Sequence, residues 1–467
     1  MYKTIADINE ALHAGQTVSS IVETSISKIK EKSSLNAFVE VFEVSARSVA
    51  AAVDKKIKKG NAGKLAGVIV GIKDNICYKG HKVSASSKIL SNFESLYTAT
   101  VLQRLIDEDA IIIGRLNCDE FAMGSSNENS FYGNVNNNFN EKYVPGGSSG
   151  GSAVAVSAGL CTIALGSDTG GSVRQPASWT NTFGLKPTYG CFSRYGLIAY
   201  ASSFDQIGVF SNCIEDSELV FELSRGEDPM DSTSISKEIN NPKQEKEKLR
   251  IGYVKEYMNH EGIDPEIKTK LHELKSKLES NNIELVECEF PYLDYLVPTY
   301  YVLSTAEASS NLSRFDGVHY GHRSDAAEGV EDTYKKSRTE GFGKEVKRRI
   351  MTGTFVLSHG YYDAYYTKAQ KVRQLVKKST DCFFKNVDVM LFPTTASTAF
   401  EQGSVKDPIQ MYLQDIFTVH ANLSGNPAIS IPFGIHSNGM PFGLQLMSDR
   451  FNEKELFSYS RILKSYL

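Results

Sequence analysis

Apolar residues recur at helical spacing through the first part of the chain. The early apolar positions are Ile8, Leu12, Ile21, Ile26 and Ile29. Their spacing places them on one face of successive helices, so we predict a helical lead-in over about residues 1–60. Thr4 or Asp7 is the candidate residue to cap the first helix.

From about residue 65 onward, short apolar runs alternate with helical segments. The runs that predict strands are 67–72, 110–114, 162–166, 249–254, 387–392 and 428–432. Helical patterns lie between them at 100–108, 153–159, 264–280 and within 342–376. This alternation is typical of an α/β fold in which helices cover both faces of a central β-sheet.

The chain has 467 residues, a length at which some α/β folds keep one large sheet. We therefore expect a single domain over 1–467, with the helical lead-in and a cap-like insertion over about 225–380. The polar stretch 225–248 is predicted to be a surface connection rather than a domain linker.

Two serine-rich glycine loops flank a small-residue helix and a strand. Residues 145–152 have the sequence PGGSSGGS, and residues 166–172 have the sequence GSDTGGS. Glycines allow the backbone to bring its N–H groups close to a ligand, and serines in the same turns can act as nucleophiles or proton carriers. The second loop follows the carboxyl end of a predicted strand, where α/β sheets tend to bind ligands.

Lys73 stands where the predicted strand 67–72 ends. A lysine held in a dry site loses basicity, because desolvation disfavours its charged form. A lone lysine at a strand end is most often solvated, and a lone glycine–serine loop is most often a turn. The combination of both loops with this lysine instead predicts one catalytic unit of Lys73, Ser148 and Ser172.

Other catalytic classes fit the sequence poorly. Residues 146–150 satisfy the GxSxG pattern, but the elbow of an α/β-hydrolase needs an apolar strand before it, and a polar loop precedes this one. Neither glycine run ends in the Gly-Lys-Ser/Thr of a phosphate-binding loop. The nine histidines show no paired metal-ligand spacing, so we expect no metal site.

Charge and cysteine content set the expected surroundings. A formal net charge of -4 and a pI near 6.2 provide no general attraction to phosphate, so we do not expect this chain to hold nucleic acid alone. The seven cysteines are scattered and odd in number, which is typical of reduced thiols. No apolar signal region or membrane-spanning run is present, so we expect a cytoplasmic protein without a membrane partner.

Three motifs resemble the amidase signature family. They are residues 145–152, residues 166–177 (GSDTGGSVRQPA) and residues 184–190 (GLKPTYG). The resemblance runs over nearly the whole chain and implies the amidase signature fold, a mixed and twisted central β-sheet covered by helices on both faces. Further segments are similar to the branch of that family that works in tRNA-dependent amidotransferases: 119–126, 308–317, 345–350 and 360–366.

The resemblance implies a Ser-Ser-Lys triad on the three residues already singled out. Ser172 corresponds to the acyl nucleophile, Ser148 to a bridging serine that follows a cis peptide bond, and Lys73 to the terminal base. In this scheme Lys73 takes a proton through Ser148 from Ser172, which attacks the side-chain amide of glutamine.

The developing oxyanion needs preorganised donors. Consecutive backbone N–H groups just before the nucleophile belong to Thr169, Gly170 and Gly171, which we predict to form the oxyanion hole.

The same resemblance implies a pocket for a free amino acid. A guanidinium suits the α-carboxylate and a carboxylate suits the α-ammonium, and these correspond to Arg348 and Asp415. Ser125, and Tyr300 or its neighbour Tyr301, are further candidates for the pocket. Arg349 is adjacent to Arg348, and the sequence leaves the choice within each pair open.

The implied function is a glutaminase subunit that supplies ammonia for converting Glu-tRNA(Gln) to Gln-tRNA(Gln). The implied partners are the B and C subunits of the amidotransferase, with tRNA contacted mainly through the B subunit. No cofactor is expected on this chain, because it has no nucleotide-binding loop, and ATP and Mg²⁺ are used by the complex. The alternative is a stand-alone amidase that cleaves small amides, which shares the triad but needs neither Arg348 nor Asp415.

Overall fold

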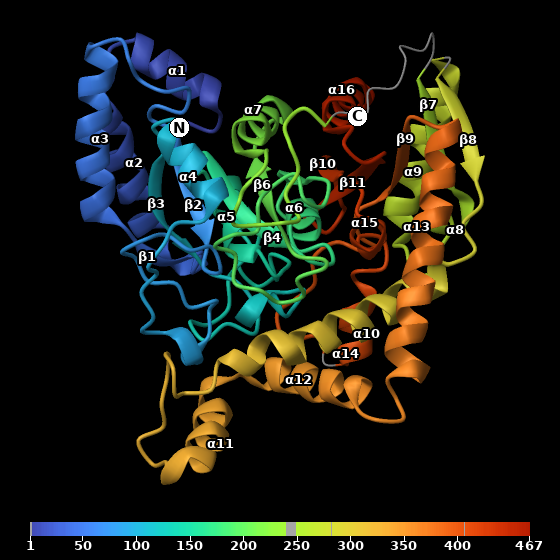
Figure 1. The fold of residues 1–467 in the computed structure, drawn as a ribbon. Helices are drawn as coiled ribbons and strands as arrows, with labels where there is room; N and C mark the ends of the chain where they lie inside the picture. The colour runs from blue at the N-terminus through green and yellow to red at the C-terminus, as the bar shows by residue number, and fades with distance from the viewer. Residues whose placement is uncertain (1, 240–248, 282, 406) are drawn as a thin grey trace.

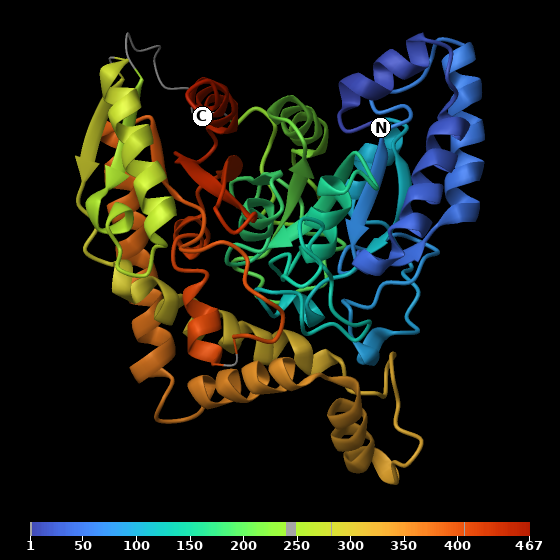
Figure 2. The same cartoon turned by 180° about the vertical axis from the view of Figure 1, so that it is seen from behind.

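The computed structural model describes residues 2–239, 249–281, 283–405 and 407–467. Its described strands form one 11-stranded sheet in the order β1-β3-β2-β4-β6-β5-β10-β11-β9-β7-β8. Strand pairs are parallel for β2 with β3 and β4 and for β7 with β8 and β9, and the other pairs are antiparallel. The sheet is therefore mixed, and helices pack on both faces, as the alternating pattern predicts (Figures 1 and 2).

The strands contribute the central layer. Their bounds are β1 Phe38–Val41, β2 Ile69–Lys73, β3 Ile111–Leu116, β4 Ile163–Asp168, β5 Phe183–Lys186, β6 Gln206–Ser211, β7 Arg250–Val254, β8 Glu284–Cys288, β9 Val389–Pro393, β10 Ala428–Ile435 and β11 Pro441–Ser448. Every residue of β2, β3, β4 and β6 is buried, which accounts for the apolar run that each of these strands contains.

The helices form the outer layers. Their bounds are α1 Ile5–His13, α2 Val18–Glu31, α3 Glu43–Lys58, α4 Thr100–Asp107, α5 Gly150–Ser157, α6 Arg174–Trp179, α7 Ile214–Ser224, α8 Lys255–Met258, α9 Pro265–Ser280, α10 Leu293–Asn311, α11 Gly329–Gly341, α12 Lys344–Leu357, α13 Lys368–Asn386, α14 Pro408–Leu413, α15 Val419–Ser424 and α16 Glu453–Lys464. A single turn of π-helix, Asp363–Thr367, precedes α13.

The lead-in contains the predicted helices α1, α2 and α3. Thr4 caps α1 by accepting from the backbone of Asp7, whose side chain accepts in return from the backbone of Thr4, so both candidate residues take part. The lead-in also contains β1, an edge strand antiparallel to β3 that the helical pattern did not predict.

The cap-like insertion expected over about residues 225–380 contributes to two different parts of the structure. Strands β7 and β8 pair into the central sheet, whereas α10 and α12 lie side by side beneath it (Figure 1). Helix α11 projects beyond them, away from the sheet. Of the predicted connection 225–248, residues 225–239 are described, and Asp228 and Asp231 are buried in them, while 240–248 lie outside the described residues.

Strands β2 and β4 place the two halves of the predicted catalytic unit at one edge. They are parallel neighbours, with Ile72 opposite Leu165, so their carboxyl ends point the same way. Lys73 ends β2, and the second serine loop, residues 166–172, begins in the last residues of β4 and continues beyond Asp168.

All seven cysteines are free thiols. None of the helices in the described ranges has the length and apolar character needed to cross a membrane.

Candidate functional site

Lys73 is completely buried and lies among serine hydroxyls from both glycine loops. Its Nζ donates to the Oγ atoms of Ser148 at 2.7 Å, Ser149 at 2.8 Å and Ser167 at 2.9 Å. Asn75 also donates to the Ser167 hydroxyl, at 2.9 Å. The structure therefore brings Lys73 and Ser148 into direct contact, as the predicted catalytic unit requires.

Burial lowers the pKa of Lys73 from 10.5 to about 8. The cause is desolvation, which penalises the ammonium form, and nearby acidic groups such as Asp119 and Asp168 act in the opposite direction. An appreciable fraction of the side chain is consequently a neutral amine at slightly alkaline pH, and a neutral amine can accept a proton.

Ser148 follows a cis peptide bond with Gly147, the geometry that the family resemblance implies. Its carbonyl accepts from the backbone of Asp119 at 3.1 Å, and the next N–H, of Ser149, donates to the carbonyl of Ser172 at 3.2 Å. The backbones of the two serine loops are thus joined beside Lys73.

Ser172 is the accessible member of the predicted triad. It retains 9% of its surface, whereas Lys73 and Ser148 retain none. A nucleophile must be reached by its substrate, while a serine that relays protons can be enclosed. The exposure pattern agrees with the two different roles expected of Ser148 and Ser172.

The loop that precedes Ser172 is held by a buried ion pair. Asp168 contacts Arg174 at 2.9 Å, and both side chains are fully buried. Burial alone would raise the pKa of Asp168, but the Arg174 guanidinium outweighs it and the pKa falls to about 2. The ionised Asp168 carboxylate accepts from the N–H groups of Gly171 at 2.9 Å and Val173 at 3.1 Å.

The hydrogen bonds accepted by Asp168 determine which of the three predicted oxyanion donors are available. The N–H of Gly171 is engaged by Asp168, so Thr169 and Gly170 are the better placed candidates in the same turn. The Thr169 hydroxyl donates to Asp205 at 2.7 Å, and the carbonyl of Gly170 accepts from Thr418 at 2.7 Å. Both neighbours fix the backbone of the turn.

Tyr300 and Tyr301 occupy different places. A Cβ on Gly170 would lie 2.5 Å from the ring of Tyr300, which is buried against the oxyanion turn. The hydroxyl of Tyr301 donates to Asp415 at 3.0 Å. Both residues therefore border the predicted site, Tyr300 at the turn and Tyr301 at the carboxylate.

Asp415 is a buried carboxylate supported by hydroxyl donors. Besides Tyr301, the Ser125 hydroxyl lies 3.1 Å and 3.0 Å from its two oxygens. Burial raises the pKa of Asp415 to about 7, against the effect of these two donors and of Arg349. Ser125 and Asp415, 290 positions apart in the sequence and each a candidate for the pocket, are in direct contact in the structure.

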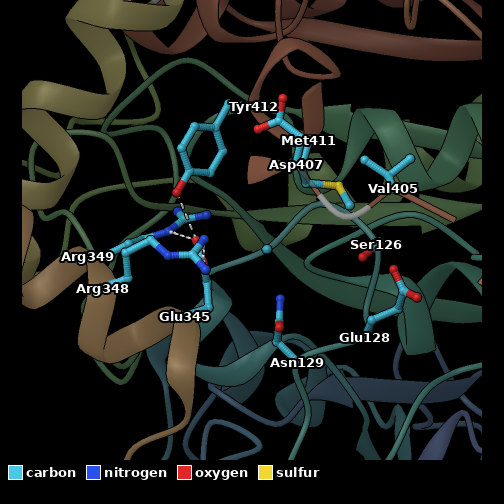
Figure 3. A pocket seen from close by; sticks show the side chains of 11 residues that line it. Ser126, Glu128, Asn129, Glu345, Arg348, Arg349, Val405, Asp407, Met411 and Tyr412 are labelled. Carbon is cyan, nitrogen blue, oxygen red and sulfur yellow. Dashed lines mark hydrogen bonds and ion pairs between the residues drawn. The ribbon is translucent and has the colours of Figure 1, made fainter. Parts of the chain in front are cut away.

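Arg348 and Arg349 both line a cavity of about 240 Å³ (Figure 3). The rest of its lining is Gly124, Ser126, Glu128, Asn129, Glu345, Val405, Asp407, Met411 and Tyr412. Arg348 keeps 39% of its side chain exposed and pairs with Glu345 at 2.7 Å. Arg349 is 4% exposed, pairs with Glu345 at 2.9 Å, and lies over the rings of Tyr301 and Tyr412.

The two arginines thus differ in what they can bind. Arg349 is enclosed by aromatic rings, and the hydroxyl of Tyr200 accepts from it at 2.8 Å. Arg348 faces the cavity with more of its guanidinium accessible, so it is the better placed of the two to meet a ligand carboxylate.

Several neighbours of the site were not predicted. Ser149 and Ser167 contact Lys73 at 2.8 Å and 2.9 Å, close to the 2.7 Å of Ser148, and they stand in the same serine loops. Glu345, which accepts from both arginines, precedes them by three and four residues, a spacing that places it beside them on a helix. This spacing is the sequence signal from which Glu345 could have been identified.

The fold and the lysine–serine cluster define an amidase. The Amidase family matches residues 20–457, and the chain belongs to this family. The A subunit of Glutamyl-tRNA(Gln) amidotransferase from Chlorobium phaeobacteroides is 47% identical over 99% of each chain, and the protein of that name from Chlorobium limicola is 50% identical over 92% of each chain.

Two solved structures share this fold over nearly the whole chain. The crystal structure of the A subunit of Glutamyl-tRNA(Gln) amidotransferase from Thermotoga maritima has a TM-score of 0.76 and 37% identity, covering 95% of this chain and 93% of that one. A structure described as a vestigial protein complex related to an s-triazine catabolic enzyme has a TM-score of 0.84 and 26% identity, covering 99% and 98%.

Proposed function

We propose that this chain is the glutamine-hydrolysing subunit of a tRNA-dependent amidotransferase, supplying ammonia for the conversion of Glu-tRNA(Gln) to Gln-tRNA(Gln). The observation that carries the proposal is the pairing of two features. A buried Lys73 contacts Ser148 at 2.7 Å. Arg348 lines the cavity nearby, and the Asp415 carboxylate lies beside that cavity, held by Tyr301, whose ring stacks on the lining residue Tyr412. Full-length relatives that carry the name of the A subunit support the same assignment.

The chemistry follows from the protonation states. Neutral Lys73 takes a proton through Ser148 as the Ser172 hydroxyl attacks the side-chain carbonyl carbon of glutamine. The N–H groups of Thr169 and Gly170 stabilise the oxyanion. The C–N bond then breaks, ammonia leaves with the relayed proton, and water hydrolyses the γ-glutamyl ester of Ser172 to glutamate.

The pocket explains a preference for an amino acid over a simple amide. Arg348 binds the α-carboxylate and Asp415, held by Ser125 and Tyr301, binds the α-ammonium. Tyr300 packs beside the oxyanion turn, where its ring lies against Gly170.

Partners are part of the proposal because released ammonia would otherwise equilibrate with solvent. We infer that the chain works in the cytoplasm with B and C subunits, and that the B subunit uses ATP and Mg²⁺ and makes most contacts with Glu-tRNA(Gln). The formal net charge of -4 supports leaving tRNA binding to a partner.

The test is glutamine hydrolysis by the purified chain, alone and with B and C subunits, Glu-tRNA(Gln) and ATP. We expect strong stimulation by the complete mixture and a loss of at least about a thousandfold in kcat for Ser172→Ala. Ser280→Ala, at an exposed serine on α9, is the matched control and should behave as wild type.

Two outcomes would overturn the assignment. Retained glutaminase activity in Ser172→Ala would remove the catalytic roles given to the serine loops. Equal hydrolysis of glutamine and simple amides by the chain alone, unaffected by the partners, would make it a stand-alone amidase.

A further inference from the structure

Gln175 lies between the two halves of the site. It is the second residue of α6, its backbone N–H donates to the carbonyl of Gly171 at 2.8 Å, and its side chain is fully buried. The side-chain Oε1 accepts from the N–H of Gly147 at 2.9 Å, and Nε2 donates to the carbonyl of Ser125 at 2.7 Å. One amide therefore bridges two loops that are otherwise separate segments of the chain.

Each end of this bridge reaches a different part of the site. Gly147 immediately precedes Ser148, whose hydroxyl contacts Lys73. Ser125 donates through its hydroxyl to both oxygens of Asp415. Gln175 itself stands three residues after Ser172, so it touches the supports of the triad and of the pocket carboxylate without facing the reacting atoms.

The chemistry at this position requires an amide. One partner is an N–H donor and the other a carbonyl acceptor, and among uncharged side chains of this length only glutamine offers an acceptor and a donor together. An ionised carboxylate has only acceptors and would face the Ser125 carbonyl, while a thioether satisfies neither partner. Space is also limited, because a Cβ on Gly146 would lie 2.7 Å from Oε1 of Gln175.

We propose that Gln175 is a positioning residue that holds Asp415 at a fixed place relative to the Lys73–Ser148 pair, so that an amino acid bound by its α-ammonium presents its side-chain amide to Ser172. The inference deepens the proposed function and rests on it. It makes Gln175 a determinant of selectivity for amino acid amides over amides that lack an α-ammonium.

The first test compares glutamine with glutaramate, which has the same amide and carboxylate but no α-ammonium. For Gln175→Met we expect kcat/KM on glutamine to fall at least tenfold, because Asp415 is no longer held at a fixed place relative to the Lys73–Ser148 pair. Because glutaramate makes no use of Asp415, its kcat/KM should fall less, and the ratio of the two substrates should drop. An equal loss on both substrates would show a merely structural role and overturn the proposal.

The second test uses Gln175→Glu and does not depend on the folding of Gln175→Met. A protonated carboxyl can accept from Gly147 and donate to the Ser125 carbonyl, whereas the ionised form cannot donate. The activity of Gln175→Glu relative to wild type should therefore decrease as pH rises, although the wild-type rate itself increases. A ratio that is independent of pH would contradict the proposed hydrogen bonds.

Controls separate this proposal from the proposed function. Gln103→Met, on α4, makes the same substitution at an exposed side chain whose amide donates to Asp107, and both substrates should react as with wild type. Ser172→Ala should be inactive on both substrates. Activity remaining in Ser172→Ala would refute the function itself, whereas an inactive Ser172→Ala with an unchanged substrate ratio in Gln175→Met would refute only the role of Gln175.

Discussion

The protonation state of Lys73 should govern the rate of the reaction. Its pKa is lowered from 10.5 to about 8, and the neutral amine is the form that accepts a proton. We expect kcat/KM for glutamine to rise with pH by up to tenfold per pH unit between about 7 and 8, to rise more steeply below about 7, where Asp415 is protonated as well, and to level off above about 8. A pH profile between 6 and 9.5, roughly one and a half to two units either side of that pKa, measures this.

Lys73→Arg is the control, because a guanidinium stays protonated at every pH of the assay and should give no measurable activity. Asp415 adds a second ionisation, since its pKa is about 7 and only the carboxylate binds an ammonium. This second limb should be absent in Asp415→Asn. A profile that stays flat from pH 6 to 9 would contradict the assignment of Lys73 as the base.

The residues of the site differ in how far sequence could identify them. Lys73 and Ser148 could be predicted because a strand end and a glycine loop are local patterns, and the structure joins them at 2.7 Å. The enclosure of Arg349 could not, because its rings come from Tyr200, Tyr301 and Tyr412, which only the fold brings together. Packing of that kind leaves no local signal.

At the level of elements, α12 carries both pocket arginines and is positioned by α10. The two helices approach closely at Gly353, where a Cβ would lie 1.9 Å from the carbonyl oxygen of Thr305 and 2.9 Å from Ser309. Gly353→Ala should push the two helices apart, destabilise the protein by about 1–3 kcal/mol and raise KM for glutamine, because Arg348 lies on the same helix. Urea unfolding and steady-state kinetics measure the two effects.

The neighbouring Met351→Ala provides a comparison on the same helix. Its side chain is 73% exposed, so the free energy of unfolding should change by no more than about 0.5 kcal/mol, with KM unchanged. If Gly353→Ala behaved like Met351→Ala, the position of α12 would not depend on this close approach.

Elements with strong local patterns were predicted, whereas strands β1, β5, β6, β8 and β11 were not. Helix α5, strand β4 and helix α9 follow the expected pattern closely. Strand β8 has an exposed and partly buried pattern because it lies at the sheet edge, and it was not predicted. The helical pattern 342–376 is interrupted after Leu357, where Gly360 has a φ of +85°, a conformation that a continuous helix does not contain.

On the scale of the molecule, the site draws on segments far apart in the chain that one sheet connects. Strands β2 and β4 supply Lys73 and the loop of Ser172, while Asp415 follows α14 and precedes α15. Strands β1 to β6 form one part of the sheet and β7 to β11 form the other. Strands β5 and β10 pair directly, and this pairing joins the two parts. Separations of this length cannot be derived from local periodicity, which is why the place of Asp415 rested on family resemblance.

The lone tryptophan reports whether these parts unfold together, as expected of a single domain. Trp179 in α6 is fully buried, and its Nε1 donates to the carbonyl of Ser397 at 2.9 Å, so it joins the helix after Ser172 to the segment after β9. We expect Trp fluorescence and far-UV circular dichroism to show the same urea midpoint, with red-shifted emission on unfolding.

A variant makes the same contact measurable without fluorescence. Trp179→Phe keeps an aromatic ring beside Phe400 but removes one hydrogen bond to the Ser397 carbonyl, which still accepts from the Thr395 hydroxyl at 2.8 Å. The lost bond should cost about 0.5–1.5 kcal/mol of unfolding free energy. Followed by circular dichroism, the urea midpoint should fall while the slope of the transition is unchanged, because the same surface is exposed in one step. Separate midpoints in the wild type, or a shallower slope in the variant, would mean that the two parts of the sheet unfold independently.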